Sequence, residues 1–400
     1  MKRRDFLKRA VGVSAMAVCS CPVSLSAGEA VQTTRAEKPR RSDRQAPVFL
    51  AGVDRGASEA TIKAAVRDAA RAATDLSWLS RGDSVFIKPA LNSGSPYPFT
   101  TSPTAIAAMV ELLREKGARR VIVGDMSGIG HVKLSPDGLS GSTRRLMEAS
   151  GMAGAVRAAG GELHFFEEAG WDAFYEDPMA AGSHWKRGLM MPAILKEVDH
   201  IVLMPRCARH VLAGSTLGLK AAVGYWRTDT RLEYHRDATT LHEKTAEANT
   251  AWTLIDKQRL VVSAADKILA TFGPDKGYVH EPEVGLVMAS ESVVAHDMVS
   301  LAWLLENRRR MPADQMDGFL DGSQMVARIA NTWVVGRLGG LRPAIVSDTL
   351  VKNDLGAIRD DRVLNRAYQV FGGAPKVTLE MVNGVLPEEL RKRLEEMTVL

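Results

Sequence analysis

From residue 48 onward, short apolar runs alternate with longer segments in which apolar side chains recur at helical spacing. The short runs predict buried strands at residues 84–88, 120–125, 162–166, 200–204 and 260–265. The longer segments predict helices over residues 58–79, 102–116, 216–225 and 291–305. This alternation is typical of an α/β fold, so we expect a mainly parallel sheet with crossover helices.

The first helices carry clear boundary signals. Ser58 and Ser102 are suited to cap helix N-termini, Pro103 suits a first helical turn, and Gly117 suits a helix end. A strand, a helix and a second strand then follow one another within residues 84–125, which predicts a right-handed parallel crossover.

These elements define one α/β domain over residues 48–305. Residues 306–400 have a charged, helical pattern with a break at 339–343. We therefore expect a helical C-terminal region that packs against the domain or caps it, and we find no candidate chemistry in it.

The N-terminal segment has the pattern of an export signal. Arg3 and Arg4 stand ahead of a weakly apolar run at residues 10–27, which is too short to span a membrane stably. We expect a twin-arginine signal peptide over residues 1–30 and a disordered basic linker over 31–47. The expected partner is the twin-arginine translocase, the expected location is the periplasm, and no transmembrane helix should remain after cleavage. An ordinary secretory signal is the alternative.

Charge and cysteine content narrow the possible functions. Residues 1–47 hold ten basic and four acidic side chains, whereas the whole chain has a net charge of +5. The rest of the chain is thus close to neutral, which argues against nucleic-acid binding. Cys19 and Cys21 lie in the leader, and lipidation of Cys21 is an open alternative. Cys207 alone cannot form an internal disulfide or hold an iron–sulfur cluster.

In open α/β sheets, ligands bind at the carboxyl ends of the strands. Lys88 ends the first of these strands and Asn92 follows it, and both are candidates to bind a carboxylate or phosphate. The alternative is a surface loop in which Lys88 points to water. Asp125 ends the next strand, and Gly128 and Gly130 follow it in a loop that lets backbone amides approach a ligand.

Further polar residues follow the glycine loop and the strand at 200–204. His131 ends the glycine loop, and Arg206 and His210 follow the strand at 200–204. Lys220 is a solitary lysine in an apolar segment, where burial favours the neutral, nucleophilic amine. A lysine that extends its amine to water from the edge of the core is the alternative. His235 comes next, in a polar stretch.

At these points the chain resembles the domain of unknown function family 362, over roughly residues 48–305. The matching segments are 87–89 with Asn92, 100–103, 123–128, 214–224 around Lys220, His235, 264–266 and 289–297. The ferredoxin-like cysteine cluster that many members carry is missing. Pro205 and Arg206 stand where a lysine–histidine pair is more common, and Ala221 stands where asparagine is usual.

The order of His131, His210, Lys220 and His235 also resembles the nickel-pincer lactate racemase family. This resemblance implies that His131 and His210 are acid/base partners, that Lys220 tethers a nickel pincer nucleotide, and that His235 ligates the metal. A racemase or epimerase of 2-hydroxy acids would follow from it.

Other assignments complete this hypothesis. Asp125, Gly128 and Gly130 would contribute to cofactor binding, and Lys88, Asn92 and Arg206 would hold an anionic substrate. The alternative is an accessory protein that binds a metal or cofactor without turnover. In that case a divalent cation could be held by Asp125, Asp266 and Asp297.

Overall fold

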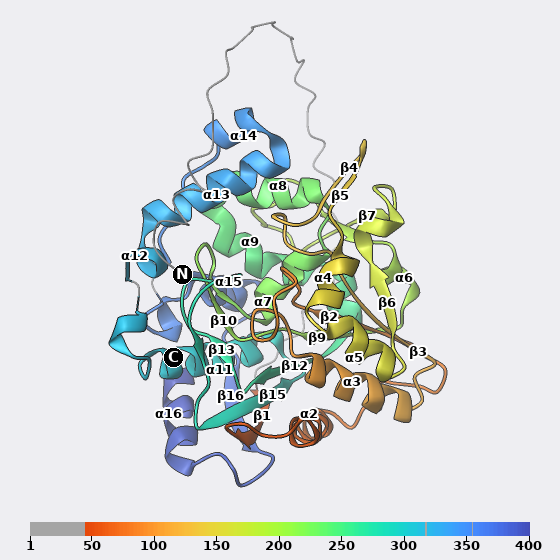
Figure 1. Ribbon diagram of the computed structural model, residues 1–400, viewed down its shortest axis with the longest axis vertical. Coiled ribbons are helices and arrows are strands. Elements are labelled where there is room, and N and C mark those ends of the chain that lie inside the picture. Colours follow the sequence, from red (N-terminus) through yellow and green to blue (C-terminus); the bar gives the residue numbers. More distant parts are fainter. Residues whose placement is uncertain (1–44, 317, 354) are drawn as a thin grey trace, which may run out of the picture. The chain divides into compact units, whose positions relative to one another are not determined.

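An eight-stranded mixed sheet forms the centre of the fold, with the strand order β16-β1-β15-β12-β9-β2-β3-β6 (Figure 1). The strands span Gln45–Asp54 (β1), Ser84–Pro89 (β2), Arg120–Asp125 (β3), Glu162–Phe165 (β6), His200–Met204 (β9), Gln258–Ala265 (β12), Val284–Ser290 (β15) and Lys376–Met381 (β16). Only β15 runs antiparallel to its neighbours β1 and β12. The predicted α/β class with a mainly parallel sheet is therefore confirmed, and the five predicted strands are all present.

The computed structural model describes residues 45–400 except 317 and 354. The predicted signal peptide lies outside the described residues, as does the predicted linker up to residue 44. Strand β1 starts three residues inside that predicted linker, because residues 45–50 pair with β16. Within the described part, no helix is long and apolar enough to cross a membrane.

The helices nearest the N-terminus begin where the capping signals predict. Helix α2 (Glu59–Ala73) is capped by the Ser58 side chain, which accepts a hydrogen bond from the amide of Thr61. Helix α3 (Pro103–Glu115) is capped in the same way by Ser102. Helix α2 ends six residues before the predicted limit, because the Thr74 hydroxyl accepts hydrogen bonds from the Leu76 amide and the Trp78 indole and so stabilises a turn.

Apolar cores lie on both faces of the sheet. Alternate residues of β2 show the separation: Val85 and Ile87 pack with α2 and α3, whereas Phe86 packs with the aromatic residues of the opposite face. Helix α11 (Val293–Arg308) is buried along almost its whole length beside β1, β12 and β15. The sheet is thus covered on both sides, which leaves the strand ends as the sites for polar chemistry.

Most of the C-terminal region is helical, as predicted. Its main helices are α13 (Gln324–Gly339), α14 (Leu341–Ile345), α15 (Arg362–Val370) and α16 (Glu388–Thr398). Strand β16 was not predicted. It lies parallel to β1 at the edge of the sheet, with Gln45 opposite Lys376. A six-residue edge strand with charged Lys376 and Glu380 carries only a weak apolar pattern, so tertiary pairing rather than local sequence determines it.

The predicted helix at 216–225 is divided into three short elements. Strand β11 (Gly214–Thr216) pairs with β10 (Ala208–His210) in a small four-stranded sheet. Helix α7 (Gly218–Ala221) and the 3₁₀ turn η2 (Ala222–Tyr225) follow. Strand pairing in this small sheet takes up the first residues of the predicted helix.

Candidate functional site

The carboxyl ends of β2 and β3 hold a buried ion pair. These strands are parallel neighbours, so Lys88 and Asp125 meet at one edge, with 2.9 Å between Nζ and Oδ2. Lys88 Nζ also donates to the carbonyl oxygen of Pro89 at 2.6 Å. Burial lowers the pKa of Lys88 and raises that of Asp125, and each partner opposes the shift of the other. Lys88 is therefore engaged within the protein rather than extended into water.

Gly224 lets the backbone approach this ion pair. A Cβ atom at Gly224 would lie 2.3 Å from both Asp125 Oδ1 and Lys88 Nζ. Arg231, on helix α8 (Thr228–Arg236), donates to the carbonyl oxygens of Ser127, Met126 and Gly224. The same guanidinium thus holds the loop after β3 against η2.

The glycine loop is packed closely against the loop after β2. The Gly128 amide donates to the carbonyl oxygen of Asn92 at 3.0 Å, and a Cβ atom at Gly128 would lie 2.8 Å from that oxygen. Close backbone approach therefore accounts for Gly128, and Asn92 takes part through its backbone. A Cβ atom at Gly130 would lie 3.1 Å from the Trp333 ring, so α13 packs against the same loop.

Lys220 is positioned by a carboxylate from α11. The amides of Gly218 and Leu219 donate to the two oxygens of Asp297, each at 2.7 Å, and so fix the start of α7. Burial lowers the pKa of Lys220 to about 7, with Arg206, Arg231 and Lys88 acting in the same direction. The side chain is deep in the protein yet keeps some contact with solvent. A lysine in these surroundings is substantially neutral at neutral pH.

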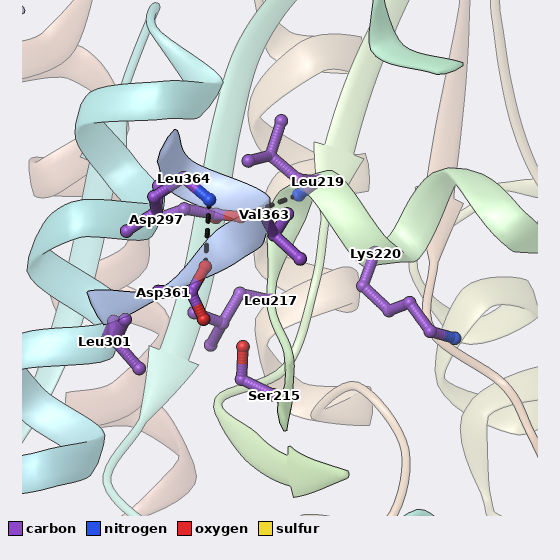
Figure 2. A pocket seen from close by; sticks show the side chains of 9 residues that line it. All are labelled: Ser215, Leu217, Leu219, Lys220, Asp297, Leu301, Asp361, Val363 and Leu364. Carbon is purple, nitrogen blue, oxygen red and sulfur yellow. Dashed lines mark hydrogen bonds between the residues drawn. The ribbon is translucent and has the colours of Figure 1, made fainter. Parts of the chain in front are cut away.

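A small pocket lies beside the stem of Lys220. Ser215, Asp297 and Asp361 line it, but the Lys220 amine points away from these side chains (Figure 2). Its cavity volume of about 10 Å³ is close to the space that one water molecule needs. The pocket is therefore too small for a substrate, and the reactive surroundings of Lys220 lie on the other side.

His210, on β10, is held as a neutral ring. Its Nδ1 accepts hydrogen bonds from the amides of Leu212 and Ala213 at 3.1 and 3.3 Å. The proton of the neutral ring is therefore on Nε2. Burial, followed by the charges of Lys220 and Arg206, keeps its pKa well below the usual value. His210 can thus donate a hydrogen bond without carrying charge.

His235, on α8, has the opposite tautomer. The Asn331 amide nitrogen donates to the His235 carbonyl oxygen at 2.8 Å, which orients the Asn331 side chain. Asn331 Oδ1 then accepts from His235 Nδ1 at 2.9 Å, so the lone pair of Nε2 is free to bind a metal or accept a proton. Burial lowers the pKa of His235 to about 3. Asn331 belongs to α13, in the region where no chemistry was expected.

Arg206 has unused hydrogen-bonding capacity. Its Nη1 donates to the carbonyl oxygens of Phe99 and Pro274, the latter at 3.1 Å. Its Nε and Nη2 are buried and have no partner among the described residues. Burial lowers the pKa of Arg206 to about 10, and nearby Asp275 opposes the shift. An unpartnered buried guanidinium edge suits a carboxylate or phosphate.

His131 lies at the margin of this group. Its side chain is 42% exposed, and its Nε2 is 3.9 Å from Asp275 Oδ2. Asp275 raises the pKa of His131 and also acts on Arg206. Asp275 therefore acts on both His131 and the buried Arg206.

Together these side chains form a buried cationic cluster, which we define as Lys88, Arg206, Lys220 and Arg231 with the neutral rings of His210 and His235. Each of Arg206, Arg231 and Lys88 is close enough to Lys220 to lower its pKa. Lys220 in turn lowers the pKa of both histidines. Asp125 is the carboxylate paired directly with a member of the cluster, Lys88. An excess of buried positive charge of this kind favours an anionic ligand.

The carboxylates considered for a hard cation are occupied by protein donors. Asp266 accepts from the Tyr97 hydroxyl at 2.7 Å, Asp125 pairs with Lys88, and Asp297 accepts the two amides of α7. In the part of the chain that the structure describes, no three His, Cys, Asp or Glu side chains are grouped to hold a metal. The described residues therefore give no support to the alternative in which these aspartates hold a hard cation.

Two side chains suit a metal-bearing nucleotide cofactor that brings its own ligands. His235 offers a free Nε2 with an oriented ring, and Lys220 offers an amine that is readily neutral. These are the chemical properties required of one metal ligand and of a covalent tether.

The chain is an α/β protein with a buried cationic cluster at the strand ends, and its sequence places it in a family. Residues 85–302 match the domain of unknown function DUF362, and the chain belongs to this family. The predicted family membership is thereby confirmed.

Among solved structures, the chain is similar to the lactate racemase apoprotein from Thermoanaerobacterium thermosaccharolyticum. The identity is 13%, the TM-score is 0.38, and the match covers 58% of this chain and 53% of that chain. The similarity thus spans only about half of the racemase. No curated protein matches the chain.

Proposed function

We propose that this protein is an enzyme that binds a small anionic substrate at the buried cationic cluster. The observation that carries the proposal is the guanidinium edge of Arg206: its Nε and Nη2 are buried beside further cationic side chains and have no hydrogen-bond partner in residues 45–400 as described. Leaving such donors unpaired costs about 1–3 kcal/mol or more. A bound carboxylate or phosphate would accept both hydrogen bonds and offset the positive charge.

The neighbouring groups supply acid/base chemistry. Lys220, with a pKa of about 7, can accept a proton or attack a carbonyl group. His210 can donate a hydrogen bond from Nε2 to a substrate oxygen without adding charge. An anion bound at Arg206 would raise the pKa of Lys220, so substrate binding itself would favour protonation of this amine.

The sharper form of the proposal is a racemase or epimerase of 2-hydroxy acids that uses a nickel pincer nucleotide. Lys220 would hold this group covalently, and His235 Nε2 would be its protein ligand. When bound, the cofactor would supply hydride transfer at the carbon that bears the hydroxyl group. Arg206 would hold the substrate carboxylate, and His131 is the candidate to accept the hydroxyl proton. His210, which the resemblance implies as the second base, has its Nδ1 occupied by two backbone amides and its proton on Nε2, so it would instead donate a hydrogen bond to a substrate oxygen.

Calorimetry with lactate and with inorganic phosphate tests the anion site. We expect the full chain to bind at least one of them, and Arg206→Gln to weaken binding at least about 30-fold, as for a lost partner of a buried charge. Arg120→Gln is the matched control, because Arg120 lies in an exposed ion pair with Glu162. Equal binding by wild type and Arg206→Gln would contradict the proposal.

The racemase form requires a separate experiment. Protein from a host that makes the pincer should contain nickel, carry an adduct at Lys220 by mass spectrometry, and interconvert D- and L-lactate. Ligand binding that leaves every tested 2-hydroxy acid unchanged would instead favour an accessory protein without turnover. Absence of both nickel and the Lys220 adduct would exclude the racemase form but not the anion site.

We also propose that the protein is exported by the twin-arginine route, on the basis of Arg3 and Arg4. Replacing both by lysine should leave the unprocessed chain in the cytoplasm on cell fractionation. The matched control is Arg35→Lys, outside the predicted signal. Unchanged export of the double variant would indicate an ordinary secretory signal.

A further inference from the structure

The outer side of the C-terminal helices exposes large apolar residues. Helix α12 (Gly318–Gly322), α13 and α14 follow one another in the chain, and α13 and α14 lie next to each other in Figure 1. We define the outer hairpin face as Phe319, Met325, Ile329, Trp333, Leu341, Ile345 and Val346. Their exposed fractions run from 46% for Ile329 to 73% for Ile345. Monomeric soluble proteins rarely expose so many large apolar side chains together.

The spacing on α13 makes this face continuous along the helix. Met325, Ile329 and Trp333 are four residues apart, so they form one stripe. Buried Val334 and Asn331 belong to the opposite side, which packs onto the protein. Helix α13 therefore has an inner face that packs onto the protein and an outer apolar face that is largely exposed, although the edge of the Trp333 ring also lies against Gly130.

The part of this face formed by α13 and α14 carries only positive charge. Residues 324–346 contain three arginines and no aspartate or glutamate, and Arg328, Arg337 and Arg342 are all exposed. Exposed apolar residues with interspersed arginines and a tryptophan are the composition of helices that lie in the interface of an anionic bilayer. A protein partner would not by itself explain the absence of acidic residues.

We propose that the outer hairpin face binds the surface of a membrane that contains anionic lipid, with α13 and α14 lying in the plane of the interface. Helix α13 has 16 residues and includes two arginines, so it does not match the length and composition of a spanning helix. The apolar stripe would enter the boundary of the acyl chains, and the arginines would contact lipid phosphates. This binding is independent of the proposed enzyme activity.

Vesicle flotation tests the proposal with the full chain. Vesicles of phosphatidylglycerol and phosphatidylcholine are compared with vesicles of phosphatidylcholine alone. The first variant is Ile329→Ser with Trp333→Ser and Ile345→Ser, and its control is Leu139→Ser with Val399→Ser, which changes exposed apolar residues elsewhere. Residues 1–44 are common to all variants, so their contribution to lipid binding cancels in the comparison.

We expect wild type and the control variant to float with the anionic vesicles, and the triple serine variant to lose most of this binding. Arg328→Gln with Arg342→Gln should lower the partition coefficient about 30-fold, because each arginine near an anionic surface contributes about fivefold. Circular dichroism should be unchanged in all variants, since the substituted residues are exposed.

Two outcomes would overturn the proposal. One is flotation of the triple serine variant equal to that of wild type. The other is that wild type does not bind vesicles but forms a dimer in analytical ultracentrifugation, and that the triple serine variant is a monomer. The face would then join two copies of this chain.

Discussion

At the residue scale, the amine of Lys220 owes its chemistry to the buried cationic groups around it. A solitary lysine in an apolar segment predicts desolvation, and the structure buries it among other cationic groups. The sequence could not indicate Asp297 as the group that fixes α7, because its contacts with Gly218 and Leu219 join residues 79 and 78 positions apart. The chemical character of a residue was therefore predictable, but its partners were not.

The lowered pKa of Lys220 predicts its reactivity. In competitive acylation followed by peptide mass spectrometry, the Lys220 amine should titrate with a midpoint near pH 7, against about 10.4 for an ordinary lysine. A midpoint near 10 would show that the amine is solvated and would remove it from the proposed chemistry.

The lowered pKa of Lys220 also makes the stability of the protein depend on pH. The unfolded chain binds the Lys220 proton more tightly than the folded protein, so wild-type stability should rise as the pH increases from about 7 towards 10.5. Methionine has no charge to bury, so the unfolding free energy of Lys220→Met should exceed that of wild type. This difference should be largest at pH 6 and smaller at pH 10. Urea denaturation at both pH values measures the difference.

Gly224 offers a second test at this scale. Gly224→Ala should destabilise the protein by about 1–3 kcal/mol, as overpacking does, because the new Cβ would overlap the Lys88–Asp125 pair. Gly154→Ala is the control: it lies in helix α5 (Met152–Ala158) with no atom within 4 Å of the new Cβ. This control should gain about 0.5–1 kcal/mol. Equal effects of the two substitutions in urea denaturation would contradict the assigned packing.

At the element scale, local signals predicted helices and strands better than they predicted contributions to the site. Helix α13 lies in the region that was expected to be helical, yet the role of Asn331 on it was missed. Its partner His235 is 96 positions away, and a lone asparagine in a helix carries no local signal. The division of residues 214–225 was also missed, because pairing between β10 and β11 outweighs helical periodicity there.

The contact between α13 and α8 predicts a loss of stability in Asn331→Ala. Two buried hydrogen bonds to His235 would be removed, at a cost of about 1–3 kcal/mol. Thr332→Ala is the matched control on the exposed side of the same helix and should stay within about 0.5 kcal/mol of wild type. NMR of the His235 ring should show loss of the single tautomer in the asparagine variant only; an unchanged tautomer would contradict the assignment.

At the scale of the whole molecule, the C-terminal region completes the fold and is more than a cap. Strand β16 is the edge strand next to β1, and Leu379, Leu386, Leu390 and Leu394 are buried in the core shared with α11. The α/β class followed from the alternation of elements. The completion of the sheet by a late strand did not, since it depends on pairing between distant segments.

Removal of residues 374–400 should therefore prevent stable folding. The four leucines would lose burial worth about 6–12 kcal/mol, which is comparable with the total stability of a typical domain. Strand β1 would also become an unprotected edge prone to aggregation. Removal of Val399 and Leu400 alone, both exposed, is the control and should leave the thermal midpoint unchanged. A soluble truncated chain with protected β1 amides in hydrogen exchange would contradict this role of β16.

The pairing of β1 with β16 also has a consequence in time. Gln45 and Lys376 are opposite each other in the sheet, yet a ribosome that adds 5–20 residues per second needs on the order of 20–60 s to pass from one to the other. For most of that interval β1 lacks both of its neighbours, because β15 is also synthesised late, and β16 completes the sheet only after most of the chain has been made. The nascent chain therefore has an extended period in which a chaperone could protect this strand before it reaches its final partner.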